Sequence, residues 1–186
     1  MLAAREDLAD KAGEIASTKG FTAFAMINNL LELTISAEAM GFSLEEAVDN
    51  YKFIKAVRNA SFTLVLESLL YDTADIAYQK AKDKTMTTWF DAGVWIGKQY
   101  ISRGREDPFT AIGRDLKAFI WNAPEFTMEK KGNEVSIRVL SPRFSESYTL
   151  LFTRFLEGIL EAFGCGVTYE EVGRGNIRLE AAKKDS

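Results

Sequence analysis

The chain has no histidine and a single cysteine among its 186 residues, and these two shortages exclude much chemistry. Without histidine there is no Ser-His or Cys-His nucleophile pair, no histidine-ligated haem and no histidine-containing zinc site. With Cys165 alone, the chain forms no internal disulfide, which fits a reducing cytoplasm. A carboxylate-only site for magnesium or calcium stays possible, but no calcium-loop spacing is present. The sequence therefore predicts a cytoplasmic protein that is not an enzyme, with no catalytic residues, metal site or cofactor.

Strong positive charge and long apolar runs are also missing. The net charge of -4 argues against nucleic acid as the main partner, because phosphate binding needs a basic face. Charged residues interrupt every apolar stretch well short of a membrane span, and the acidic N-terminal segment does not resemble a secretory signal. The thirteen phenylalanines, by contrast, are many, and they indicate an aromatic core or a lined apolar cavity.

The first sixty residues have helical patterns. One helix begins near Leu8 and ends near Gly20, and a second spans about 22–40 before Gly41. Ser43 followed by Glu46 is a capping box, which predicts a third helix beginning there. Residues 1–60 are therefore predicted to form a helical extension, and residues 61–186 a second domain.

Three further helices are predicted before Pro124. Apolar residues recur at helical spacing over 60–82 and over 86–103, and the second of these helices ends at Gly104. Asp107 and Pro108 then supply a cap and a first-turn residue for a helix over 108–121.

After Pro124 the apolar residues no longer recur at helical spacing but at every second position. Alternating residues on either side of the turn at 131–133 predict a β-hairpin, and a second hairpin is predicted around the turn at 173–175. An amphipathic helix over about 145–163 joins them. The predicted fold class is α+β, with helices packed on one face of a four-stranded antiparallel sheet and an added N-terminal helical segment.

Two stretches carry most of the information about packing. Gly93 and Gly97 lie inside a predicted helix, where each glycine costs about 1 kcal/mol relative to alanine, so we expect another backbone to approach there. The helix from Tyr148 to Phe163 has an apolar face wider than a simple stripe. Its aromatic residues are consistent either with a central core helix or with the lining of an apolar tunnel.

The ordered set of motifs resembles the larger subunits of the transport protein particle (TRAPP), which are tethering proteins. The matching residues are Phe62-Thr63-Leu64, the Gly93 to Gly97 stretch, Tyr148, Leu151, Leu156, Gly158, Leu160 and Glu161, and Ile177-Arg178. The resemblance implies a non-enzymatic scaffold of a vesicle-trafficking complex, either a homodimer or a hetero-assembly with related subunits. It also implies packing and dimer contacts, which we assign to Gly93, Gly97, Phe62, Leu66 and Leu69.

The same superfamily is similar to 4-vinyl reductase-type domains, which bind small hydrophobic molecules. That likeness implies an alternative function, a ligand-sensing domain with an apolar pocket. Under either interpretation the pocket residues are expected to be Phe152, Phe155, Leu156, Gly158 and Ile159. An apolar molecule or acyl chain would be held non-covalently, because the position of the acylated cysteine in the trafficking subunits falls near Glu106.

Overall fold

The computed structural model describes residues 5–59, 62–104, 107–120 and 122–184. Its contacts divide the chain into two compact units, residues 1–55 and 56–186, which are described separately. The boundary predicted between residues 60 and 61 lies outside the described residues, as does Glu106. Within the described ranges, no helix is both long and apolar enough to cross a membrane.

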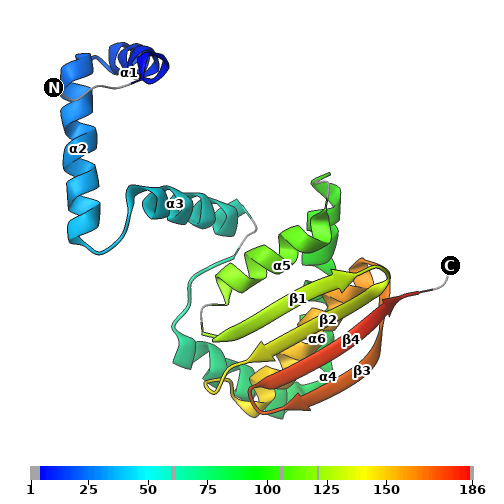
Figure 1. The fold of residues 1–186 in the computed structure, drawn as a ribbon. Coiled ribbons are helices and arrows are strands. Elements are labelled where there is room, and N and C mark those ends of the chain that lie inside the picture. The colour runs from blue at the N-terminus through cyan, green and yellow to red at the C-terminus, as the bar shows by residue number, and fades with distance from the viewer. Residues whose placement is uncertain (1–4, 60–61, 105–106, 121, 185–186) are drawn as a thin grey trace. The chain divides into compact units, whose positions relative to one another are not determined.

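The N-terminal unit is built from three helices, α1 (Glu6–Thr18), α2 (Ala23–Ala39) and α3 (Leu44–Asn59), the last of which continues into the second unit (Figure 1). Gly20 and Gly41 end the first two helices with positive φ angles of 74° and 84°. The amide that follows Gly20 donates to the Ala16 carbonyl at 2.9 Å, which is the bond that closes a Schellman motif. These glycines explain why both helices stop where the sequence predicts.

The predicted capping box at the start of α3 is confirmed. The Ser43 hydroxyl accepts from the Glu46 amide at 3.2 Å, and the Glu46 carboxylate accepts from the Ser43 amide at 2.7 Å. Two amide groups without a helical partner are therefore satisfied reciprocally at this end of the helix.

Helix α4 (Glu67–Ser102) replaces the two helices predicted over 60–82 and 86–103. Its backbone departs from helical geometry only at Ala81, with φ -152° and ψ 56°. The Thr85 hydroxyl donates to the carbonyls of Ala77 at 3.1 Å and Ala81 at 2.9 Å, so a side chain satisfies the acceptors that the kink frees. The predicted break is thus a kink within one element.

The prediction of a helix from residue 60 is wrong for the segment 62–66, which is extended. Leu66 is the residue that precedes the helix and has φ -65° and ψ 128°. Two of the five residues, Thr63 and Val65, are β-branched and suit extended backbone. The Phe62 ring packs on the ring of Phe119 with centroids 4.7 Å apart, so a tertiary contact outweighs the helical spacing.

The remaining elements follow the predicted order. They are α5 (Pro108–Phe119), β1 (Glu125–Lys131), β2 (Glu134–Leu140), α6 (Glu146–Ala162), β3 (Cys165–Gly173) and β4 (Asn176–Lys183). Asp107 caps α5 by accepting from the Thr110 amide at 3.1 Å, and Ser145 caps α6 by accepting from the Tyr148 amide at 3.1 Å. Both caps use short polar side chains, which compete well for the first amides of a helix.

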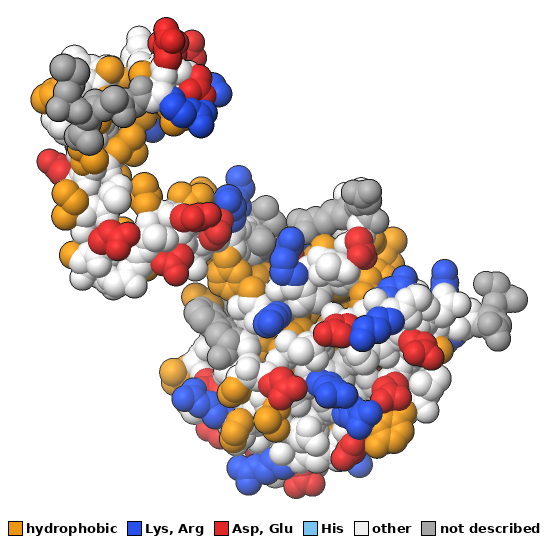
Figure 2. Space-filling view, viewed as in Figure 1, with side chains coloured by type: hydrophobic (Ala, Val, Ile, Leu, Met, Phe, Trp, Pro, Cys, Tyr) orange, Lys and Arg blue, Asp and Glu red, His pale blue; other side chains and the backbone are white. Residues whose placement is uncertain are grey.

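The four strands form one antiparallel sheet in the order β1-β2-β4-β3. Helices α6 and α4 lie on one face of this sheet, so the predicted α+β class is confirmed (Figure 1). The inward residues of the two central strands are buried and alternate with exposed or half-buried ones; they are Val135, Ile137, Val139, Ile177, Leu179 and Ala181. Charged side chains of both signs cover the opposite face (Figure 2). This alternation is what an antiparallel sheet with one solvated face requires.

Helices α4 and α6 cross at glycines. A Cβ atom at Gly93 would meet the carbonyl of Phe155, and one at Gly158 would meet the carbonyl of Phe90. At Gly97 a Cβ would lie 2.6 Å from the Cβ of Ala162. The absence of side chains at these positions therefore lets the two helix backbones come into direct contact.

Candidate functional site

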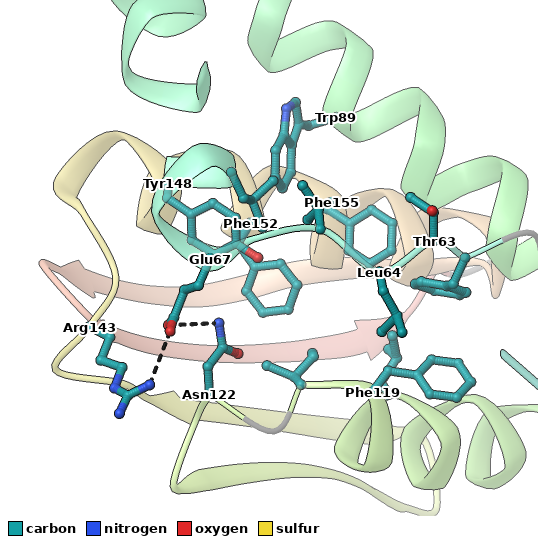
Figure 3. Close-up of a pocket in the computed structure, with 15 residues that line it drawn as sticks. Thr63, Leu64, Glu67, Trp89, Phe119, Asn122, Arg143, Tyr148, Phe152 and Phe155 are labelled. Carbon is teal, nitrogen blue, oxygen red and sulfur yellow. Dashed lines mark hydrogen bonds and ion pairs between the residues drawn. The ribbon is translucent and has the colours of Figure 1, made fainter. Parts of the chain in front are cut away.

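A pocket of about 670 Å³ lies in the C-terminal unit, beside α6 (Figure 3). It is bounded by the extended segment 62–66, the first turns of α4, the end of α5 and one face of α6. Its lining residues are Phe62, Thr63, Leu64, Val65, Glu67, Leu70, Trp89, Leu116, Phe119, Ile120, Asn122, Arg143, Tyr148, Phe152 and Phe155. The volume lies within the range of small-molecule sites, and the lining is mostly apolar.

One wall of the pocket is aromatic. Tyr148, Phe152 and Phe155 stand on one face of α6 because their spacing of four and three residues follows the helical repeat. The Tyr148 and Phe152 rings are stacked with centroids 6.0 Å apart, and Phe152 is likewise stacked on Phe155 at 5.9 Å. Trp89 of α4 meets Tyr148 edge to face at 5.4 Å. The wall presents flat ring surface, which favours an apolar ligand body.

The other wall comes from the segment that the sequence predicted as helix. Leu64 and Val65 are exposed, and the Phe62 ring is held against Phe119 of α5. Figure 3 shows Leu64 and Phe119 facing the aromatic wall across the pocket. A helical 62–66 segment could not place all of these side chains toward α5 and α6 together, so the extended backbone is part of the site.

Polar side chains gather at one end of the pocket. Glu67 accepts hydrogen bonds from Tyr71 at 2.8 Å and from Asn122 at 3.3 Å. Its second carboxylate oxygen forms an ion pair with Arg143 at 3.0 Å. The Asn122 side-chain amide also donates to the Tyr71 hydroxyl at 2.7 Å, and the backbone carbonyl of Asn122 accepts from the Ser141 hydroxyl at 2.6 Å. The pocket therefore has one polar end within a mostly apolar lining.

These contacts set the charges at the polar end. The hydrogen bond from Tyr71, helped by Asn122 and Arg143, lowers the pKa of Glu67 against the opposing effect of burial. Burial raises the pKa of both Tyr71 and Tyr148, and the Glu67 carboxylate adds to the rise. At neutral pH the pocket is accordingly lined by an ionised Glu67 and a neutral Tyr148, and the Tyr71 that donates to Glu67 is neutral too.

Of the residues predicted to bind a ligand, the structure brings two to the pocket. Phe152 and Phe155 line it, whereas Leu156, Gly158 and Ile159 do not. The last three are buried on the faces of α6 that meet α4 and the sheet. Phe152, Leu156 and Ile159 share one apolar stripe of α6, so the helical repeat alone does not tell which of them face the cavity and which fill the core.

The residues predicted for packing and dimer contacts lie in three different places in the structure. Gly93 and Gly97 contact α6 of the same chain. Phe62 lines the pocket, while Leu66 and Leu69 are exposed at the start of α4. The glycines therefore serve the fold of the unit, and the two leucines remain on its surface.

Sequence reasoning missed the polar end of the pocket. The Glu67 carboxylate is held by Tyr71, Asn122 and Arg143. Asn122 and Arg143 lie 55 and 76 residues further along the chain. No local pattern links three polar residues so widely separated, so only the fold reveals the cluster.

The described residues of the pocket lining offer no ligand set for a metal ion or for haem. Within the described ranges, no group of three or more histidine, cysteine, aspartate or glutamate side chains is placed to hold a metal ion. The described lining contains no histidine, cysteine or methionine that could ligate haem iron. Tyr148 is its one tyrosine, and burial raises the pKa of that phenol, which disfavours the phenolate that binds iron. The pocket residues therefore do not fit an iron-ligated haem.

Comparisons with known proteins give only distant likenesses. No family model and no curated protein matches the chain. A solved structure from work on haem distortion in the H-NOX family has a TM-score of 0.38 and 13% identity, covering 76% of this chain and 90% of that one. A Cs H-NOX mutant carrying 4-cyano-L-phenylalanine has a TM-score of 0.35 and 13% identity, with coverages of 68% and 82%. Likenesses at this level assign neither a family nor a function.

These findings correct the predicted family. The structural neighbours are H-NOX domains and not transport protein particle subunits, so the predicted scaffold in vesicle trafficking is wrong. The 4-vinyl reductase-type assignment has no support either. The physical reason lies in the motif residues: Gly93, Gly97 and Gly158 allow α4 and α6 to touch, and Leu151 and Leu156 fill the core. Such residues report how helices pack, and unrelated proteins meet the same packing demand.

Proposed function

We propose that this protein is a binding domain for a small apolar molecule, held non-covalently in the pocket between α6 and the 62–66 segment. The observation that carries the proposal is the aromatic wall of Trp89, Tyr148, Phe152 and Phe155 beside a cavity of about 670 Å³. Aromatic surface that lines a concave site is stabilised when an apolar ligand displaces water from it.

Binding is favoured over catalysis by the state of the polar residues. Glu67, the one carboxylate in the lining, already accepts three hydrogen bonds, and its pKa is lowered. A general base works best with a pKa near the operating pH, and the shift at Glu67 runs in the opposite direction. We therefore keep the expectation that the protein is not an enzyme, and we assign it a ligand-sensing or carrier role.

The proposal predicts that a charge placed on the aromatic wall will abolish binding. In Phe155→Glu a carboxylate replaces a half-buried ring of the lining, so an apolar ligand would have to desolvate it. We expect the affinity for decanol or decanoate, measured by isothermal titration calorimetry on the full chain, to fall roughly tenfold or more. Native mass spectrometry of the wild-type protein should also detect the bound probe, which denaturation should release.

Leu33→Glu is the matched control, because Leu33 lies on α2 outside the pocket with 58% of its surface exposed. This variant introduces the same charge on a helix and should leave probe affinity unchanged. Binding of neither probe to the wild-type protein would contradict the proposed function. Equal losses in the two variants would also contradict it, since they would place the probe on the exposed apolar surface of the N-terminal helices.

We further propose that the partner of the N-terminal helices is a second copy of this chain. Among the described residues of the first unit, only Ala16 and Ala37 are buried, so this unit has almost no core of its own. Large apolar side chains are exposed along α2 and α3, including Phe24 and Tyr51 at 76% and 68% (Figure 2). Exposed apolar area on this scale marks an interaction surface.

The charges of α3 favour a second copy as the occupant. Its first half carries exposed Glu45, Glu46 and Asp49, and its second half carries exposed Lys52, Lys55 and Arg58. Two such helices packed antiparallel around Tyr51 would place each acidic half beside a basic half. A two-fold interface requires a surface that complements itself, and this helix has that property.

Charge reversal on α3 tests this interface. Glu45→Lys with Asp49→Lys gives the helix a net positive charge and keeps the capping residue Glu46, whereas Lys52→Glu with Lys55→Glu gives it a net negative charge. Each double variant alone should dimerise at least about tenfold more weakly than wild type, and an equimolar mixture should restore dimers, because opposite charges then face one another. Light scattering after size-exclusion chromatography measures the mass. A monomeric wild-type protein, or mixtures no different from the separate variants, would contradict the proposal.

A cytoplasmic setting belongs to the same proposal. Cys165, the chain's one cysteine, is buried at the start of β3, and burial raises the pKa of its thiol. A buried thiol with a raised pKa is unreactive and needs no oxidising environment to persist.

A further inference from the structure

The Tyr148 hydroxyl is a polar atom for which the structure supplies no partner. The side chain is 7% exposed, and no hydrogen bond reaches its hydroxyl from any described residue. Among the described residues, every side-chain oxygen or nitrogen that is fully buried has a hydrogen-bond partner. Since the Tyr148 hydroxyl has none, it is not fully buried, and it is accessible from the pocket that Tyr148 lines. Figure 3 shows it directed toward the interior of that pocket. A phenol so placed can both donate to and accept from a ligand.

Asn122 presents a second polar atom to the same space. Both protons of its amide nitrogen are used, one on Glu67 and one on the Tyr71 hydroxyl. The carboxylate can only accept, so it fixes which end of the Asn122 amide faces it. The side-chain carbonyl oxygen of Asn122 is left without a partner among the described residues and points into the pocket (Figure 3). It accepts hydrogen bonds and therefore selects a ligand that donates one.

The charge at this end discriminates against acids. Glu67 is ionised and is paired with Arg143, so the pocket offers no free positive charge to a ligand carboxylate. An acidic ligand would have to face Glu67 or displace it from Arg143, whose side chain is largely exposed. Like charges in a mostly apolar site repel strongly, whereas a neutral head group avoids this repulsion.

We propose that the ligand is an amphiphile with an apolar body and a neutral hydroxyl head, the hydroxyl accepting from Tyr148 and donating to Asn122. The apolar body lies against the Trp89 and Phe152 wall, and the head lies at the Glu67 end. This inference rests on the proposed function, because it assigns the chemical class of the molecule bound in the same pocket.

The test compares three probes with the same chain on the full-length protein. Decanol should bind about tenfold or more tightly than decanoate at neutral pH, because only the acid carries a negative charge to the Glu67 end. Decanol should also bind about fivefold more tightly than its methyl ether, which cannot donate to Asn122. In Tyr148→Phe, decanol affinity should fall about fivefold while the unfolding midpoint stays unchanged, since the lost hydroxyl had no protein partner. Calorimetric titration provides the affinities.

Tyr169→Phe is the matched control, because it removes the hydroxyl of an exposed tyrosine on β3 outside the pocket, and it should alter none of the affinities. Decanoate or the ether binding as tightly as decanol would overturn the assignment of the head group. An unchanged decanol affinity in Tyr148→Phe would do the same. If the head-group assignment failed in this way but Phe155→Glu still lost binding, the proposed function would stand. If no probe bound at all, both the head-group assignment and the proposed function would be wrong.

Discussion

Replacing Gly158 by alanine is expected to lower the free energy of unfolding by about 3 kcal/mol. Gly158 lies where α6 crosses α4, and an added Cβ would meet the Phe90 carbonyl and lie 2.9 Å from the Val94 amide nitrogen. Both obstacles are backbone atoms inside a helix, so neither can rotate aside as a side chain would. The two helices must separate, which loosens the core that they share with the sheet.

Gly13→Ala is the matched control, because Gly13 lies inside α1 and has no atom within 4 Å of an added Cβ. Alanine should raise the stability of that helix by roughly 0.5–1 kcal/mol, the intrinsic difference between the two residues. Urea denaturation of both variants followed by circular dichroism measures the change. If Gly158→Ala unfolded at the wild-type urea concentration, the close crossing of α4 and α6 would be wrong.

Leu156→Ala is expected to cost about 3 kcal/mol in stability while leaving probe affinity in the pocket unchanged. Leu156 is fully buried, with 0% exposure, and it does not line the pocket. Its truncation removes apolar contacts and leaves a cavity that the surrounding core can only partly fill. The loss should therefore appear in unfolding experiments and not in calorimetric titrations performed well below the melting temperature.

Truncation of Phe155, the residue before Leu156, should affect ligand binding more than stability. Phe155 is half-buried and lines the pocket, so Phe155→Ala should destabilise the protein less than Leu156→Ala and weaken decanol binding severalfold. The pair thus separates folding from binding at two consecutive positions of one helix. Weaker decanol binding in Leu156→Ala at full folding would contradict the location assigned to the pocket.

Local signals account for the parts of the fold that the sequence predicted well. The Ser43–Glu46 capping box, the Asp107 cap and the two hairpins each depend on residues close together in the chain, and the structure contains all of them. The wrong helix over 62–66 shows the limit of such signals. Its apolar spacing suits a helix, but the contact between Phe62 and Phe119 depends on a residue far along the chain.

The candidate site was only half predictable for the same reason. Phe152 and Phe155 could be found because they repeat at helical spacing on one amphipathic helix. Glu67, Asn122 and Arg143 could not, because each comes from a different element and none belongs to a local pattern. The family resemblance was wrong because its motif residues are those that pack at the α4–α6 crossing and in the core, and packing residues do not identify a family.

The strand order β1-β2-β4-β3 leaves two edges at which another polypeptide could add a strand and begin aggregation. Helix α5 lies beside β1 at one edge (Figure 1). At the other, the register of β3 shifts between Val167 and Tyr169, and Glu170 and Glu171 follow in the exposed part of the strand. An irregular, negatively charged edge is a poor template for β-pairing. This edge would therefore keep the sheets of two copies from pairing if the proposed association through the N-terminal helices brings those copies together.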